Sequence, residues 1–124
     1  MRSSEVRVFD DTDLEFIDIL RNLNMSRNVA STLAFLSNVN EATSKDLELG
    51  SQLRQPEVSI AVKELKIFGW LDEREIKKEG KGRPMKVYKL AVPMGEIVNY
   101  LEKQTKEDTQ RTMKNIEKLK KLRF

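Results

Sequence analysis

Residues 43–71 read TSKDLELGSQLRQPEVSIAVKELKIFGWL, and this stretch decides the fold. Thr43 and Asp46 have the spacing of a capping box, in which a hydroxyl and a carboxylate three residues later satisfy free amides at the start of a helix. Gly50 can adopt the left-handed conformation that ends such a helix, and Leu53 can fill the corner of the turn that follows. The first part of the stretch therefore predicts a short helix and a tight turn.

A second helix is predicted over residues 55–68. Pro56 suits its first turn, where a missing amide costs nothing, and Gly69 can end it. Apolar side chains recur at helical spacing and are expected to form one buried stripe. They are Val58, Ala61, Val62, Leu65 and Phe68. Two short helices joined by a tight turn indicate a helix-turn-helix.

The opposite face of the second helix carries side chains that could read DNA. In a helix-turn-helix this face lies in the major groove, and the residues near its N-terminus reach base edges. Gln55 could pair with adenine, Arg54 with guanine or phosphate, and Ile60 with a thymine methyl group. Ser59 could pair with either purine. Exposed polar residues on a capped amphipathic helix are equally typical of a solvated face that binds nothing.

Composition narrows the possible functions. The chain of 124 residues is expected to form one domain with an appended helix. It contains no cysteine and no histidine. The sequence therefore excludes disulfides, catalysis by a thiolate or an imidazole, and the usual zinc or copper ligands. We therefore expect no enzyme activity and no cofactor. No apolar run approaches the roughly 20 residues that span a bilayer, and no signal peptide is visible, so a soluble cytoplasmic protein without a membrane partner is expected.

Charge is distributed unevenly along the chain. Residues 77–89 carry six basic side chains and one acidic side chain, whereas residues 1–20 carry six acidic and two basic ones. The net charge of the whole chain is only +3. This asymmetry predicts contact with a polyanion at one place on the surface.

After Gly69 the spacing of apolar residues changes from helical to strand-like. Strands are predicted over residues 70–76 and 85–92, and the basic sequence KKEGKGRP at residues 77–84 can reverse the chain between them. Lysine-rich hairpins are often only solvated loops. A basic hairpin directly after a DNA-reading helix, however, is typical of a wing that contacts phosphates or the minor groove. The candidate wing contacts are Lys78, Lys81 and Arg83.

Segments on both sides complete the expected architecture. Residues 1–10 lack periodicity and are expected to form a flexible arm, residues 11–92 the winged helix-turn-helix domain, and residues 93–124 a C-terminal helix. The helix that begins near residue 11 is apolar over more than half its circumference, and the C-terminal helix has apolar ends around a polar middle. We expect these two helices to form the interface of a homodimer.

Residues 26–92 resemble the winged helix-turn-helix domain of prokaryotic, especially archaeal, transcriptional regulators of the MarR, ArsR and TrmB type. The resemblance is carried by Thr43, Asp46, Leu47, Leu53, the runs 54–59 and 65–71, Gly82-Arg83-Pro84, Lys86, Tyr88 and Leu90. It implies a homodimer that binds a palindromic operator in double-stranded DNA and usually represses transcription. Metal-sensing ArsR proteins use cysteine or histidine ligands, which this chain lacks, so the ArsR likeness is one of fold.

By analogy with these regulators, the base-reading positions are Gln55, Glu57, Ser59, Ile60 and Lys63. The full set of candidate DNA-binding residues is Thr43, Arg54, Gln55, Glu57, Ser59, Ile60, Lys63, Lys78, Lys81 and Arg83. The expected fold class is α+β, mainly α with a small β-hairpin wing and with flanking dimerisation helices. No small-molecule effector site is indicated by the sequence.

Two other functions are compatible with the same pattern. One is a winged-helix protein-interaction module of a transcription assembly, favoured by Glu57 and Glu64 because carboxylates on the reading face repel phosphate. The other is an abundant architectural protein that binds DNA without sequence preference.

Overall fold

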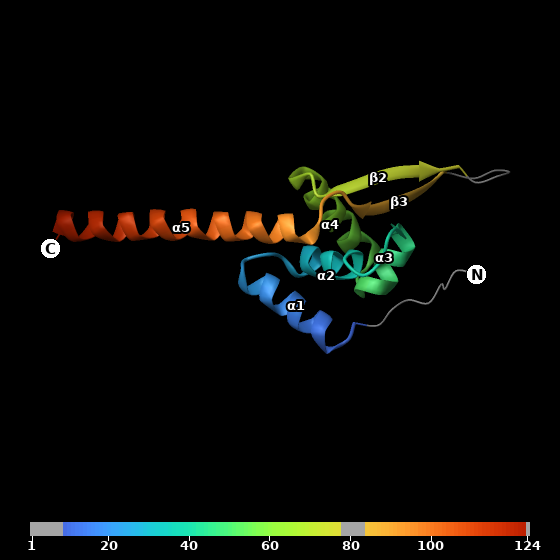
Figure 1. The fold of residues 1–124 in the computed structure, drawn as a ribbon, viewed down its shortest axis with the longest axis horizontal. Helices are drawn as coiled ribbons and strands as arrows, with labels where there is room; N and C mark the ends of the chain where they lie inside the picture. Colours follow the sequence, from blue (N-terminus) through green and yellow to red (C-terminus); the bar gives the residue numbers. More distant parts are fainter. Residues whose placement is uncertain (1–8, 78–83, 124) are drawn as a thin grey trace. The chain divides into compact units, whose positions relative to one another are not determined.

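The computed structural model describes residues 9–77 and 84–123. The chain divides into two compact units, Met1–Val92 and Pro93–Phe124. The described elements, in chain order, are α1 (Asp11–Asn22), α2 (Arg27–Leu36), β1 (Ala42–Thr43), α3 (Ser44–Ser51), α4 (Gln55–Phe68), β2 (Leu71–Ile76), β3 (Met85–Leu90) and α5 (Met94–Arg123) (Figure 1). The expected flexible arm, residues 1–10, lies almost entirely outside the described residues.

Side-chain caps fix where the first helices of the larger unit begin. Asp10 and Asp13 form a capping box at the start of α1, and the Ser26 hydroxyl accepts from the Val29 amide at the start of α2. The predicted capping box of α3 is confirmed, because Thr43 Oγ1 accepts from the Asp46 amide at 3.1 Å and Asp46 Oδ2 accepts from the Thr43 amide at 3.0 Å. These contacts satisfy amides that lack partners within the helix.

The prediction that Gly50 ends α3 is wrong. Gly50 lies inside the helix, which ends at Ser51, and Gln52 takes the left-handed conformation with φ 58° and ψ 43°. The glycine is needed for packing instead, because a Cβ atom at Gly50 would overlap the ring of Phe35 on α2. Its missing side chain therefore lets α3 approach α2 closely. Leu53 is buried at the turn, as predicted.

Helix α4 has the predicted bounds, and Gly69 ends it with φ 78° and ψ 20°. Its buried stripe was predicted correctly except at the last position. Phe68 is 47% exposed, and its ring stacks on Trp70 with the centroids 4.2 Å apart. The left-handed turn at Gly69 redirects the chain, so that Trp70 occupies the buried position in place of Phe68.

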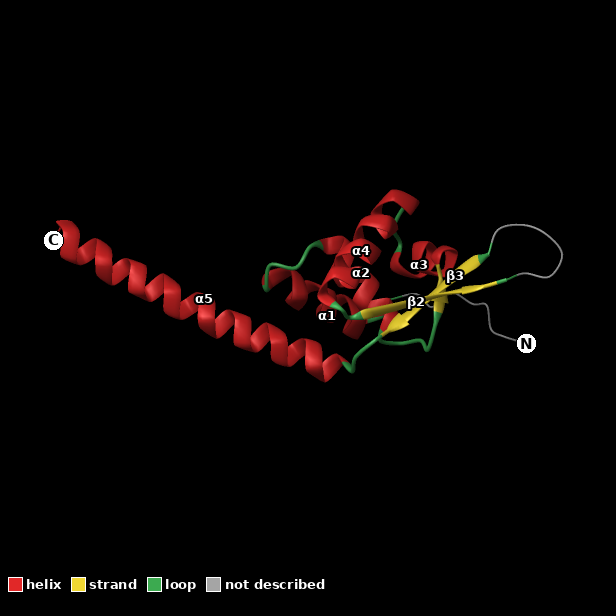
Figure 2. Cartoon of the chain, turned by 90° about the horizontal axis from the view of Figure 1, so that it is seen from above, coloured by secondary structure: helices red, strands yellow, loops and turns green. Residues whose placement is uncertain are grey.

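A three-stranded antiparallel sheet in the order β1-β3-β2 completes the larger unit (yellow in Figure 2). Strands β2 and β3 pair from Leu71↔Leu90 to Ile76↔Met85, so the predicted hairpin is confirmed up to the segment 78–83, which lies outside the described residues. Strand β1 was not predicted from the sequence. Its two residues pair with Tyr88 and Val87 of β3 and tie the start of α3 to the sheet.

Helix α2 is the centre of the core. Every side chain from Val29 to Leu36 is buried, and the helix packs against α1, α3 and α4. Helix α1, by contrast, buries only Ile17 and Leu20 among its apolar residues. Three large apolar side chains in and just after α1 are exposed, namely Leu14, Ile19 and Leu23. The excess of apolar surface predicted for this helix is therefore present in the folded chain.

The second unit is the single 30-residue helix α5. Pairs such as Glu102–Lys106 and Asp108–Arg111 join neighbouring turns of its polar middle. Its last turns expose an apolar series consisting of Met113, Ile116, Leu119 and Leu122. Among the described residues, no helix is both long and apolar enough to cross a membrane.

Candidate nucleic-acid interface

The exposed face of α4 brings together most of the residues predicted to read bases. Gln55, Ser59 and Lys63 are exposed at successive turns of one helical face. Ile60 is 51% exposed beside them. This part of α4 therefore presents both hydrogen-bonding and apolar groups to solvent.

Two of these side chains contact each other. Gln55 Nε2 donates to Ser59 Oγ at 3.0 Å, across one turn of α4. Because the bond is exposed, water or a ligand can replace it at a net cost of about 0.5–1.5 kcal/mol. The pair orients the Gln55 amide along the helix before any ligand arrives.

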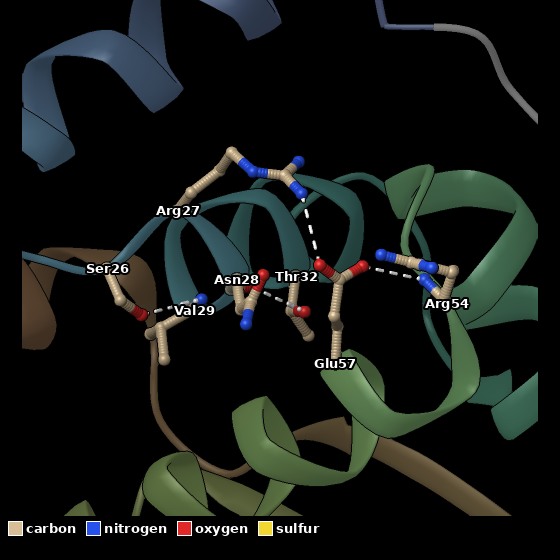
Figure 3. Close-up of polar contacts among 7 residues, drawn as sticks. All are labelled: Ser26, Arg27, Asn28, Val29, Thr32, Arg54 and Glu57. Atoms are coloured by element: carbon tan, nitrogen blue, oxygen red, sulfur yellow. Dashed lines mark hydrogen bonds and ion pairs between the residues drawn. The ribbon is translucent and has the colours of Figure 1, made fainter.

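Glu57 is engaged by groups of the protein itself (Figure 3). Its Oε1 accepts from the Arg54 amide at 2.9 Å, which satisfies a free N–H at the start of α4. Its Oε2 lies 3.4 Å from Nη2 of Arg27, at the start of α2. The carboxylate thus joins the N-termini of α2 and α4, and its charge is partly neutralised by the guanidinium of Arg27.

Arg54 and Thr43 occupy the N-cap positions of the two helices in the motif. Arg54 is the exposed N-cap residue of α4, and its guanidinium makes no cap hydrogen bond. Thr43 is the half-buried N-cap of α3, so its position is fixed by the capping box and by its pairing with Val87. The remaining candidates, Lys78, Lys81 and Arg83, lie outside the described residues.

A groove of about 470 Å³ lies between one face of α4 and the sheet. Its walls come from the start of α3, one face of α4, and strands β2 and β3; the lining residues are Ser44, Gln55, Val58, Ser59, Val62, Lys63, Lys66, Ile67, Glu73, Lys86 and Tyr88. Gln55, Ser59 and Lys63 belong both to this groove and to the predicted reading face. The groove and the reading face are therefore continuous.

Glu73 links the two walls of the groove. Its Oε1 accepts from Lys66 Nζ on α4 at 3.0 Å, and its Oε2 lies 3.7 Å from Lys86 Nζ on β3. The hydrogen bond from Lys66 is the main reason that the pKa of the Glu73 carboxyl lies below its usual value, with a further contribution from Lys86 and some opposition from burial.

Nothing in the sequence marked this cluster as part of the site. Lys66 belongs to the exposed face of α4 and Lys86 to the basic stretch 77–89, but Glu73 had no feature that set it apart from other strand glutamates. The pairing Glu73↔Tyr88, with Lys86 two residues before Tyr88 on the same face of β3, brings the groups together. Within the described residues, no cluster of acidic side chains could hold a metal ion.

Comparisons with solved structures agree with the fold built from the elements above. A possible transcriptional regulator from Methanosarcina mazei Go1 is similar with a TM-score of 0.63 and 20% identity, over 85% of this chain and 87% of that one. The crystal structure of NadR in complex with 4-hydroxyphenylacetate has a TM-score of 0.52 and 14% identity over 98% and 91%. Transcriptional regulator PA4135 has a TM-score of 0.52 and 17% identity over 90% and 82%.

No protein-family model matches the chain, and no curated protein matches it. At these identities the likeness concerns the fold. The predicted fold class is confirmed: the chain is a winged helix-turn-helix, mainly α with a small antiparallel sheet, in the form found in structures described as transcriptional regulators.

Proposed function

We propose that this chain is a DNA-binding transcriptional regulator that works in the cytoplasm as a homodimeric repressor. The observation that carries the proposal is the exposed face of α4, where Gln55, Ser59, Ile60 and Lys63 lie together on a capped helix. A helix presented in this way fits the major groove, where its first turns can reach base edges.

The exposed residues of α4 are suited to different contacts with DNA. The Gln55 amide suits the two hydrogen-bonding groups of adenine, and Ile60 suits a thymine methyl group. Arg54 can contact guanine or phosphate, and Lys63 can contact a guanine edge or a phosphate. Thr43 at the start of α3 is suited to a backbone phosphate, which helix N-termini favour. The base contacts would give sequence preference, and the phosphate contacts would fix the position of the protein along the duplex.

We assign Glu57 to positioning rather than to direct base contact. Both of its oxygens have partners within the protein, at Arg54 and Arg27. A carboxylate held in this way sets the angle at which α4 leaves the turn. Its pairing with Arg27 also weakens the electrostatic argument for a protein partner in place of DNA.

The wing would add affinity that does not depend on sequence. Strands β2 and β3 lead into the basic segment, and Lys78, Lys81 and Arg83 are proposed to contact phosphates or the adjacent minor groove. Such contacts position a protein on the duplex without reading the sequence.

Dimerisation is proposed to use the two helices that leave apolar side chains exposed. In α1 these are Leu14 and Ile19, and in α5 they are Met113, Ile116, Leu119 and Leu122. Burying them against a second copy would remove apolar area from water and generate the two-fold symmetry that a palindromic operator requires.

Fluorescence anisotropy tests the proposal with the protein's own upstream DNA and with a scrambled duplex of equal length, each across a salt series. A regulator should prefer its own DNA, with an affinity that falls steeply as salt rises. Equal affinity for both duplexes would favour the architectural function. Absence of binding to either duplex at low salt would instead favour a protein partner for α4.

A further inference from the structure

We propose that the groove between α4 and the sheet binds a phosphate of the DNA backbone, and that Glu73 occupies the place of that phosphate in the free protein. This inference rests on the proposed DNA-binding function and adds a site to it. The residues that carry it are Lys63, Lys66, Lys86 and Glu73, none of which belongs to the segment 78–83.

The charge of the groove favours an anionic ligand. Its lining contains three lysines and one glutamate, which leaves an excess of two positive charges. Lys66 and Lys86 share the single carboxylate of Glu73, at 3.0 and 3.7 Å. The groove thus has more ammonium groups than the described part of the chain neutralises, and an added phosphate would meet attraction from both walls.

The geometry of Glu73 matches that of a phosphodiester. Each of its two carboxylate oxygens faces one ammonium group, on α4 and on β3 respectively. A phosphodiester likewise carries one negative charge shared by two non-bridging oxygens, and lysine binds phosphate as a point charge without strict geometry. A phosphate could therefore bridge the same two lysines.

The exchange requires little rearrangement. The side chains of Lys66 and Lys86 are 47% and 51% exposed, so both ammonium groups can turn toward a ligand without disturbing the core. The Glu73 side chain is 21% exposed and can move toward solvent. Exposed pairs of this kind contribute only about 0–1 kcal/mol, so a phosphate can displace the carboxylate.

The position of the groove connects this site to base reading. Gln55 and Ser59 line the groove and also lie on the exposed face proposed to enter the major groove. The backbone of a strand that borders the major groove would then run beside α4, and its phosphate would meet Lys66 and Lys86. In the absence of DNA, Glu73 would keep these lysines from binding polyanions indiscriminately.

The test compares Glu73→Gln with Glu41→Gln. Glu41 forms an ion pair with Arg74 at 2.6 Å but does not line the groove, so both variants lose one surface carboxylate and differ in its location. We expect Glu73→Gln to bind own and scrambled duplexes roughly 5- to 20-fold more tightly at about 50 mM salt, because two lysines become available to phosphate. The slope of the logarithm of affinity against the logarithm of salt concentration (the salt slope) should become more negative by about 1–2. Glu41→Gln should change affinity less than about twofold, by long-range charge alone.

A second pair of variants tests the site without altering Glu73. Lys86→Gln should weaken binding to both duplexes and lower the salt slope by about 1. Its control is Lys89→Gln, which removes an exposed lysine from the same strand outside the groove. We expect Lys89→Gln to retain more of the wild-type affinity and slope than Lys86→Gln.

The possible outcomes separate this site from the proposed function. One outcome would overturn the phosphate site alone: the wild type prefers its own DNA, but neither Glu73→Gln nor Lys86→Gln differs from its control. The proposed function as a DNA-binding regulator would then still stand. If the wild type binds no DNA at low salt, both proposals are wrong. A gain in affinity at Glu73 together with a loss at Lys86 supports the site.

Discussion

Arg27 and Glu57, separated by 30 positions in the sequence, meet at 3.4 Å where the N-termini of α2 and α4 come together. The same Glu57 carboxylate accepts from the Arg54 amide and so completes the start of α4. The buried helix at the centre of the core is thereby linked to the helix proposed to read DNA. We expect the direction of α4 to depend on this contact as well as on the apolar stripe beneath it.

The first prediction concerns this link. Glu57→Ala removes the acceptor of the Arg54 amide and the partner of Arg27, and should lower the free energy of unfolding by about 1–2 kcal/mol. Glu57→Gln should cost less, because its amide oxygen can still accept from the Arg54 amide. Urea denaturation measures both. Glu64→Ala, at an exposed position on the same helix, is the control, and an equal effect of Glu57→Ala and Glu64→Ala would contradict the link.

The second prediction follows from the contact between α2 and α3. Gly50→Ala places a methyl group against the Phe35 ring, and should destabilise the domain by about 1–3 kcal/mol. Gly95→Ala is the matched control, since nothing lies within 4 Å of a Cβ atom there and alanine favours the helix. Thermal unfolding should give opposite signs for the two variants. Phe35→Leu should recover part of the loss caused by Gly50→Ala if the ring is its cause.

Local signals explain what could be predicted of the fold. Pro56 marks the start of α4 and Gly69 its end, and the capping box at Thr43 fixes the start of α3. Each of these signals affects only the backbone a few residues away, so each can be recognised in the sequence. Gly50 was assigned the wrong role because glycine serves equally at a left-handed helix end and at a close approach between helices. The difference depends on Phe35, which belongs to another helix.

The groove could not be predicted for a related reason. Lys66, Glu73 and Lys86 lie on three elements, and only the packing of α4 on the sheet and the register of β2 and β3 bring them together. Strand β1 is two residues long, too short to show any alternation, and exists because β3 offers a free edge beside it. Such features are set by tertiary structure, which leaves no periodic pattern in the sequence.

The third prediction separates base reading from backbone binding. Gln55→Ala should reduce the preference for the operator over random DNA by about 1–3 kcal/mol, with little change in salt dependence. Lys81→Ala should weaken binding to all duplexes about equally and lower the salt slope by about 1. Anisotropy titrations with both duplexes measure the two effects. If the change at Lys81 altered only sequence preference, the proposed division between α4 and the wing would be incorrect.

The fourth prediction concerns the exposed apolar end of α5. Ile116→Asp with Leu119→Asp should convert the proposed dimer to monomers, because two charges would enter its proposed apolar interface. Operator affinity should fall by about tenfold or more, since the two half-sites would then be bound independently. Sedimentation equilibrium gives the mass of the particle in solution. Thr109→Asp, at an exposed position in the polar part of the helix, should leave the dimer intact.

The fifth prediction is a pH dependence at Glu73. The pKa of its carboxyl is lowered in the folded protein, chiefly by the hydrogen bond from Lys66, so its ionised form contributes stability above the unfolded pKa. That contribution is lost as the pH falls through the folded pKa. Because glutamine resembles the protonated carboxyl, wild type and Glu73→Gln should differ most in stability near neutral pH.

The measurement is the free energy of urea unfolding between about pH 7 and pH 3, a range that includes the ordinary glutamate pKa of about 4.3. The advantage of the wild type over Glu73→Gln should narrow steadily toward the acid end. In a Lys66→Gln background the same comparison should depend much less on pH, because the main cause of the lowered pKa is absent. If the advantage of the wild type grew on acidification, the sign of the linkage would be reversed and the interaction of Glu73 with the lysines would not be stabilising.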